Sequence, residues 1–207
     1  IAPPADYGAD MVCGDIQPLG VHMNYGGGVG GFIASRDEAE YVSQYPTHLV
    51  SIASTEDGTG FGFGFCTHER TLYAVREKGK DFTGTTVGLW TIAAAVYLAL
   101  MGPAGMREIG ETIIQKSHYA ARLLSEIPKV KVLFTPYFFK EFVVNFDGVK
   151  KSVRDVNKYL LDHKIFGGKD LTTEFPELGN SSLYSVTEIH TKGELDRLAG
   201  TMQEAMR

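Results

Sequence analysis

The sequence has few cysteines and no excess of positive charge. Its two cysteines, Cys13 and Cys66, form neither a CxxC pair nor a disulfide framework in 207 residues. We therefore expect two buried free thiols in a reduced, cytoplasmic setting. The formal net charge of −5 argues against nucleic acid or an anionic membrane as a partner.

The common catalytic signatures are also missing. There is no GxSxG nucleophile motif, no P-loop, and no GxGxxG motif followed by a suitable helix. The histidines are scattered singly, so we expect no metal site. The glycines at 26, 27, 28, 30 and 31 could let the backbone approach a phosphate. Their spacing alone favours a tight loop with positive φ.

The longest apolar stretch is shorter than a membrane-spanning helix. The most apolar stretch, Thr86–Met101, is shorter than the roughly 20 residues that span a bilayer, so we expect a buried core helix. The first ten residues, IAPPADYGAD, lack the positively charged n-region of a signal peptide and an initiating methionine. We expect a piece of a longer protein.

The residue patterns predict both strands and helices. Residues 8–15 and 30–35 favour strands, and the Gly–Phe alternation within 58–65 favours an extended segment with one apolar face. The sequence MGPAG separates the apolar helix from a second helix over 103–127. After it, residues 131–135, 141–146 and 183–188 favour strands. Helices over 153–163 and from Thr191, with capping residues, complete a small two-layer α+β domain.

One basic segment is a candidate binding site. Residues 70–80 read RTLYAVREKGK, and residues 81–86 read DFTGTT. Arginine, lysine and threonine side chains can bind a phosphate or a carboxylate. Composition alone favours the alternative interpretation, a solvated helix end.

Taken together, several segments carry a family resemblance. They are PPADYGADMVCGDIQPLGVHMNYGGG, THER followed by REK, GPAGMREIG, QKSHYAARLLSEIP, FFKEFVV and VTEIHTKGELDRL. In this order they resemble the glycine cleavage system P-protein, glycine dehydrogenase (decarboxylating), most closely subunit 1 of its two-subunit form. The resemblance implies the α/β fold of the C-terminal half of a fold-type I pyridoxal-phosphate (PLP) enzyme. It divides the chain into a remainder of the large domain (1–102), a linking helix (103–130) and a small α+β domain (131–207).

The resemblance also implies that the two subunits of the enzyme have different roles. The family's catalytic subunit carries a His–Lys pair after the first strand, and here Gln17 and Pro18 stand in that place. Proline has no amine, so the resemblance implies that a partner, subunit 2, holds PLP covalently. It further implies decarboxylation of glycine and transfer of the aminomethyl group to the lipoyl group of the H-protein. This chain alone is expected to be inactive.

The resemblance assigns the cofactor-facing side chains to the basic segment: Arg70, Arg76, Lys78, Thr83 and Thr85. The family's Ala-Thr-Ser-Asn after REK is replaced here by Gly79-Lys80-Asp81-Phe82, which puts polar contacts at those positions in question. Two alternatives stay open. One is a purely structural or assembly subunit, and the other is a fragment of another fold-type I enzyme, such as an aminotransferase or a cysteine desulfurase.

Overall fold

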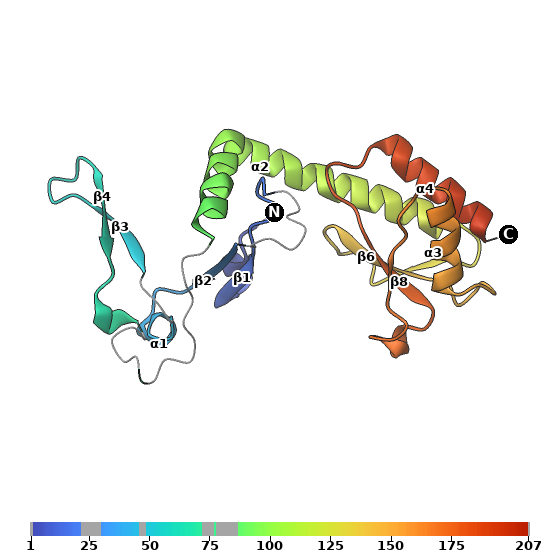
Figure 1. Cartoon of the computed structure of the whole chain (residues 1–207), viewed down its shortest axis with the longest axis horizontal. Coiled ribbons are helices and arrows are strands. Elements are labelled where there is room, and N and C mark those ends of the chain that lie inside the picture. The colour runs from blue at the N-terminus through green and yellow to red at the C-terminus, as the bar shows by residue number, and fades with distance from the viewer. Residues whose placement is uncertain (1, 22–29, 46–48, 72–76, 78–86, 207) are drawn as a thin grey trace. The chain divides into compact units, whose positions relative to one another are not determined.

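The chain forms two compact units, Ala2–Gly102 and Pro103–Arg207, which we call the N-terminal unit and the C-terminal unit. The computed structural model shown in Figure 1 describes residues 2–21, 30–45, 49–71, 77 and 87–206.

The N-terminal unit is built from two antiparallel hairpins and little else in its described part. Strand β1 (Met11–Asp15) pairs with β2 (Gly31–Ser35), and β3 (Val50–Ser54) pairs with β4 (Phe61–Phe65). The three strands expected from the sequence are confirmed, and β3 is an additional one. Short helices accompany the hairpins: η1 (Pro4–Tyr7), α1 (Ala39–Val42) and η2 (His68–Arg70).

The cysteines differ from expectation in one respect. Both are free thiols, as predicted, but Cys13 is exposed and Cys66 is only half-buried. Cys13 lies on β1, whose single partner among the described strands is β2. A two-stranded ribbon has no second layer of its own to cover such a side chain, so the prediction of buried thiols was wrong.

Helix α2 (Gly88–Ser125) covers most of both predicted helices and ends two residues before the predicted end at Ile127. Gly102 interrupts it with φ 59° and ψ −179°, and Pro103 follows, as the MGPAG sequence predicted. The part before the break was expected to be buried, which is wrong within this chain. Its large apolar side chains are exposed: Leu89, Ile92, Val96, Leu98 and Leu100.

By length and composition alone α2 could cross a membrane. The apolar stretch nevertheless ends at the Gly102 break, and the continuation beyond it carries charged residues, Arg107 and Glu108 among them. A run of this length is shorter than a bilayer span requires.

The C-terminal unit contains a four-stranded antiparallel sheet in the order β5-β6-β8-β7. Its elements are β5 (Lys131–Leu133), β6 (Glu141–Asn145), α3 (Val153–Asp162), β7 (Lys169–Asp170), η4 (Pro176–Leu178), β8 (Ser181–Ser185) and α4 (Lys192–Ala205). The expected β-β-α-β-α order holds, with the two-residue strand β7 as an addition. Strand β8 begins two residues earlier and ends three residues earlier than predicted.

A continuous core holds the C-terminal unit together. Leu124 of α2, Val144 of β6, Leu160 of α3 and Met202 of α4 are each fully buried in it. The expected apolar stripe of α4 is present, with Leu195, Met202 and Ala205 buried and Leu198 packed at the edge. Burial of such side chains is the main force that stabilises a domain of this size.

Both helices that cover the sheet begin with a reciprocal cap. The Thr191 hydroxyl accepts from the Glu194 N–H, and the Glu194 carboxylate accepts from the Thr191 N–H at 2.7 Å. Ser152 and Asp155 make the same exchange at α3. Each cap satisfies backbone donors that the first helical turn leaves free.

Candidate functional site

The turn after β1 is the position where the family resemblance places the PLP-binding lysine. The Asp15 carboxylate accepts from the Gln17 N–H at 3.0 Å, and the Ile16 carbonyl accepts from the Leu19 N–H at 2.9 Å. Pro18 lies in this turn and is exposed. A proline at this place fixes φ and contributes no amine.

Two glycines let this turn pack closely on its neighbours. Gly20 has φ +77°, and a side chain there would come within 3.0 Å of Tyr97 on α2. At Gly30, an added Cβ would lie 2.6 Å from the Ile16 side chain. The glycine-rich sequence therefore has a packing role at these two positions. Gly26, Gly27 and Gly28 lie outside the described residues.

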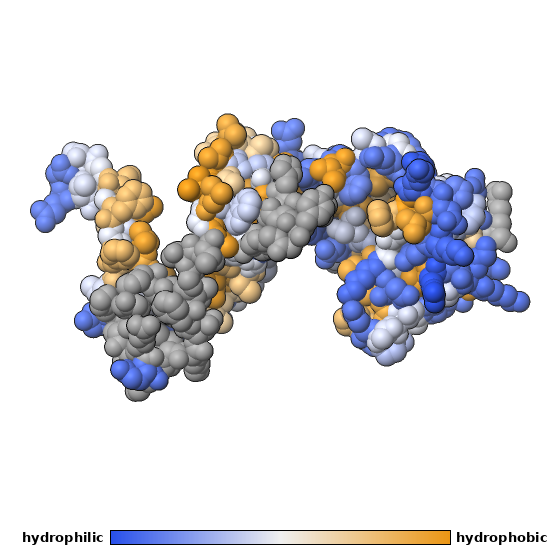
Figure 2. All heavy atoms as spheres, in the orientation of Figure 1, coloured by the Kyte–Doolittle hydropathy of each residue, from blue (hydrophilic) through white to orange (hydrophobic). Residues whose placement is uncertain are grey.

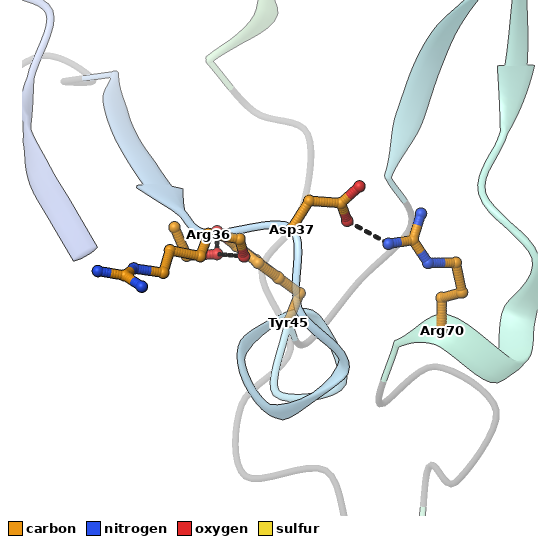
Figure 3. Close-up of polar contacts among 5 residues, drawn as sticks. Arg36, Asp37, Tyr45 and Arg70 are labelled. Carbon is orange, nitrogen blue, oxygen red and sulfur yellow. Dashed lines mark hydrogen bonds and ion pairs between the residues drawn. The ribbon is translucent and has the colours of Figure 1, made fainter. Parts of the chain in front are cut away.

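The second cluster lies at the end of β2 (Figure 3). Arg70, at the end of η2, donates to the Asp37 carboxylate, while the Tyr45 hydroxyl donates to the Ser35 Oγ at 3.1 Å. Arg36 pairs with Asp10 at 2.9 Å. The Arg70–Asp37 pair joins the segment after β2 to the segment after β4, which are distant in sequence.

The electrostatics of this cluster follow from its exposed ion pairs. The Asp37 carboxylate raises the pKa of Arg70 above its ordinary value. The negative charge of Asp10 raises the pKa of the Tyr41 hydroxyl. The Arg70 guanidinium has five N–H donors, and Asp37 engages one of its nitrogens. An arginine in this state can still bind a second anion.

Only one of the predicted cofactor-facing residues can be located. Arg70 is exposed and ion-paired with Asp37. Arg76, Lys78, Thr83 and Thr85 lie outside the described residues, so their role stays a prediction. Within the described ranges, no group of three His, Cys, Asp or Glu side chains is placed to hold a metal ion.

The sequence analysis missed a groove of about 380 Å³ in the C-terminal unit. Lys164, His190 and Arg197 line it, together with apolar side chains of β8 and α4. Arg197 donates to the His163 carbonyl, and Glu194 belongs to the α4 cap. Arg70, the predicted site residue that the structure describes, does not line this groove, and no local motif in the sequence indicated it.

The comparison with protein families decides the identity of the fold. The model of the glycine cleavage system P-protein matches residues 1–202. The chain belongs to the glycine cleavage system P-protein family. The resemblance inferred from the sequence is confirmed.

Similar P-proteins come from archaea. "Probable glycine dehydrogenase (decarboxylating) subunit 1" of Staphylothermus marinus is 40% identical over 198 residues, 96% of this chain and 42% of the relative. The protein of the same name from Saccharolobus solfataricus is 38% identical over 207 residues, 100% of this chain and 43% of the relative. The chain thus spans less than half the length of the curated relatives that it matches.

Solved structures agree with the family and with the fold class. A glycine decarboxylase (P-protein) of the glycine cleavage system, crystallised in inhibitor-bound form, matches 99% of this chain and 45% of its own with a TM-score of 0.81 and 32% identity. The cysteine desulfurase CsdA of Escherichia coli has a TM-score of 0.61 at 16% identity, over 97% of this chain and 47% of its own, and shows the fold alone. The expected fold-type I PLP-enzyme fold is confirmed.

Proposed function

We propose that this P-protein family member is part of subunit 1 of a two-subunit glycine dehydrogenase (decarboxylating), and that it completes an active site whose PLP is held by the partner subunit. The names of the relatives support a two-subunit enzyme. The family match favours this function over an aminotransferase or a cysteine desulfurase. A cytoplasmic location accompanies the proposal.

One observation carries the assignment of roles between the subunits. The turn over residues 15–21 contains no lysine, since its sequence is DIQPLGV. None of its side chains has an amine, so covalent attachment of PLP does not fit this turn. We therefore assign the covalent link to the partner subunit, and binding and positioning to this chain.

The proposed chemistry assigns this chain an electrostatic role. When bound, PLP supplies an electron sink for the loss of carbon dioxide from glycine, and the aminomethyl group passes to the lipoyl group of the H-protein. Arg70, Arg76, Lys78, Thr83 and Thr85 are proposed to bind the anionic groups of cofactor or substrate. Charge-assisted bonds of this kind contribute about 1.5–3 kcal/mol each.

The domain assignment is part of the same proposal. Residues 1–102 belong to the large domain, 103–130 form the link, which is helical as far as Ser125, and 131–207 form the small domain. A large domain that continues in the rest of a longer protein accounts for the exposed apolar side chains of α2 before Gly102.

Reduction with borohydride tests the observation on which the proposal rests. The full-length complex is incubated with PLP, reduced, digested and analysed by peptide mass spectrometry. We expect a stoichiometric label on one lysine of subunit 2 and none on this chain. A stoichiometric label on a lysine of this chain, such as Lys78, would show that the roles of the subunits are assigned wrongly.

The variant Arg76→Ala separates an active-site role from a purely structural one. In the full-length complex we expect glycine-dependent exchange of labelled carbon dioxide to fall about 10- to 100-fold, because a charge-assisted contact is lost. Size exclusion should show an intact complex. Arg154→Ala, an exposed arginine on α3, is the matched control and should exchange at the wild-type rate. Equal rates for both variants would favour the assembly-subunit alternative.

A further inference from the structure

Asp37 is a charged residue beside Arg70 to which the proposed function gives no role. It follows β2, and its carboxylate accepts from Nη2 of Arg70 at the end of η2 (Figure 3). The side chains of Arg70 and Asp37 are 47% and 81% exposed. Exposed ion pairs of this kind add little to the stability of a fold. The main physical effect of this pair is therefore on where the Arg70 guanidinium lies.

The backbone that carries Asp37 is held from two sides. The Arg36 N–H donates to the Asp10 carbonyl at 3.3 Å, and the Arg36 carbonyl accepts from the Ser35 hydroxyl at 3.0 Å. The Tyr45 hydroxyl in turn donates to the Ser35 Oγ at 3.1 Å. These contacts connect the residue before Asp37 to the segment before β1 and to the segment after α1. Asp37 therefore extends from a part of the chain that has few conformations open to it.

The Arg70 side chain is held at both of its ends. At the backbone end, its N–H donates to the Thr67 carbonyl at 3.1 Å, and the next residue, Thr71, is buried. At the other end, the guanidinium has the Asp37 carboxylate and the Cys66 side chain as neighbours, and both raise the pKa of Arg70. Nearly half of the side chain is nevertheless open to solvent. This arrangement fits a cation that is oriented in advance for another group.

We propose that Asp37 is a positioning residue, which orients the Arg70 guanidinium toward an anionic group in the active site. The inference rests on the proposed function, in which Arg70 binds such a group. The anion is the phosphate of PLP or the carboxylate of glycine, because both offer the charged oxygens that a guanidinium binds. A guanidinium has five N–H donors and Asp37 accepts at one of its nitrogens, so donors remain for the anion.

Asp37 has two opposing effects on the binding of that anion. By holding the arginine side chain in place, it removes the entropy loss that a free side chain would suffer on binding. Its own negative charge repels the anion, but two anions on different edges of an exposed guanidinium interact weakly in water, and salt screens them further. The first effect should therefore be the larger one. Loss of Asp37 should weaken anion binding, whereas simple neutralisation of Arg70 by Asp37 predicts that its loss would strengthen binding.

Two measurements on the full-length complex of both subunits test this sign. Equilibrium dialysis gives the Kd of PLP for the complex freed of cofactor, and glycine-dependent exchange of labelled carbon dioxide gives the KM for glycine. For Asp37→Ala we expect at least one of these constants to rise about 3- to 10-fold with kcat retained. A higher Kd of PLP identifies the phosphate as the anion, and a higher KM identifies the glycine carboxylate. If both constants equal the wild-type values or fall below them, the proposal is overturned.

Matched variants separate positioning from a role in the fold. Asp37→Glu keeps the carboxylate and should restore most of the affinity. Glu174→Ala removes the similarly exposed ion pair Lys169–Glu174 of the C-terminal unit, and it should change neither constant. Size exclusion and thermal melting should show that Asp37→Ala assembles and unfolds like the wild type. A lower melting temperature with both constants unchanged would confine Asp37 to a structural role and overturn the proposal.

Arg70→Ala distinguishes failure of the inference from failure of the proposed function. If Asp37 acts through Arg70, adding Asp37→Ala to Arg70→Ala should raise neither constant further. A further rise would overturn the positioning role. If Arg70→Ala raises a constant and Asp37→Ala does not, only the inference is overturned. If Arg70→Ala raises neither constant, the anion-binding role that the proposed function gives to Arg70 fails together with the inference.

Discussion

The two units of this chain use their apolar residues in opposite ways. In the C-terminal unit, side chains from α2, β6, α3, β8 and α4 meet in one core. In the described part of the N-terminal unit, the few buried hydrophobic side chains lie outside this core, and five large ones on the β3–β4 hairpin are exposed (Figure 2). From this difference we expect the C-terminal unit to be stabilised by its own residues, and the N-terminal unit to need packing surfaces beyond its described residues.

The largest expected effect comes from two leucines of the same helix. Leu124 is 0% exposed and Leu100 is 81% exposed, although both belong to α2. Leu124→Ala should lower the free energy of unfolding of this chain by about 2–5 kcal/mol, because it creates a cavity in a packed core. Leu100→Ala, the matched control, should change it by less than about 0.5 kcal/mol. Urea denaturation followed by circular dichroism measures both.

The same pair of variants sharpens the comparison in the full-length complex. If the N-terminal unit is completed by other segments, Leu100→Ala should become destabilising there while the effect of Leu124→Ala stays the same. If both variants lowered the free energy of unfolding of the chain alone by the same large amount, the face of α2 before Gly102 would already be buried. The two units would then not differ in how they use their apolar residues.

A smaller effect concerns the tip of the β3–β4 hairpin. The Asp57 pKa of about 2 lies below the ordinary 3.8 because Thr55 and Thr59 donate to its charged form. Because the hydrogen bonds favour the charged carboxylate, they stabilise the folded tip above about pH 4. This stabilisation is lost as the pH falls toward 2 and Asp57 is protonated. Thr55→Val should raise the pKa toward its ordinary value.

Carbon-13 NMR titration of the Asp57 carboxyl group measures this shift. Thr67→Val is the control, since Thr67 is exposed and lies beyond the end of β4. An Asp57 pKa near 3.8 in the unaltered chain would show that the tip is not held by these hydrogen bonds.

Much of the fold could be predicted because its signals are local. Thr191 and Glu194 specify the start of α4 through their own backbone contacts, and Gly102 and Pro103 specify the break in α2. Strand β4 followed from strict alternation of Phe and Gly. Strand β7 was missed because two residues carry no periodicity and form a strand only through pairing with β8.

Burial and the site were harder to predict for a physical reason. Whether Cys13 or Leu100 is buried depends on what packs against the strand or helix, and the local sequence does not contain that information. The ion pair between Arg70 and Asp37 joins segments more than thirty positions apart, and no motif links them. Pro18, by contrast, has no amine, which its chemistry alone shows, and the covalent link of PLP to the partner subunit stays a prediction.

The break at Gly102 also limits how far folding cooperativity can extend. With φ 59° and ψ −179°, this residue occupies a backbone region that is open essentially only to glycine, and Pro103 has no N–H to donate across the break. The helical hydrogen-bond ladder is therefore interrupted where one compact unit ends and the other begins. Fraying of the helix before Gly102 cannot spread along the ladder into the segment that carries Leu124. The C-terminal unit can melt as a separate thermodynamic block, even though the two units share one long helix in the sequence.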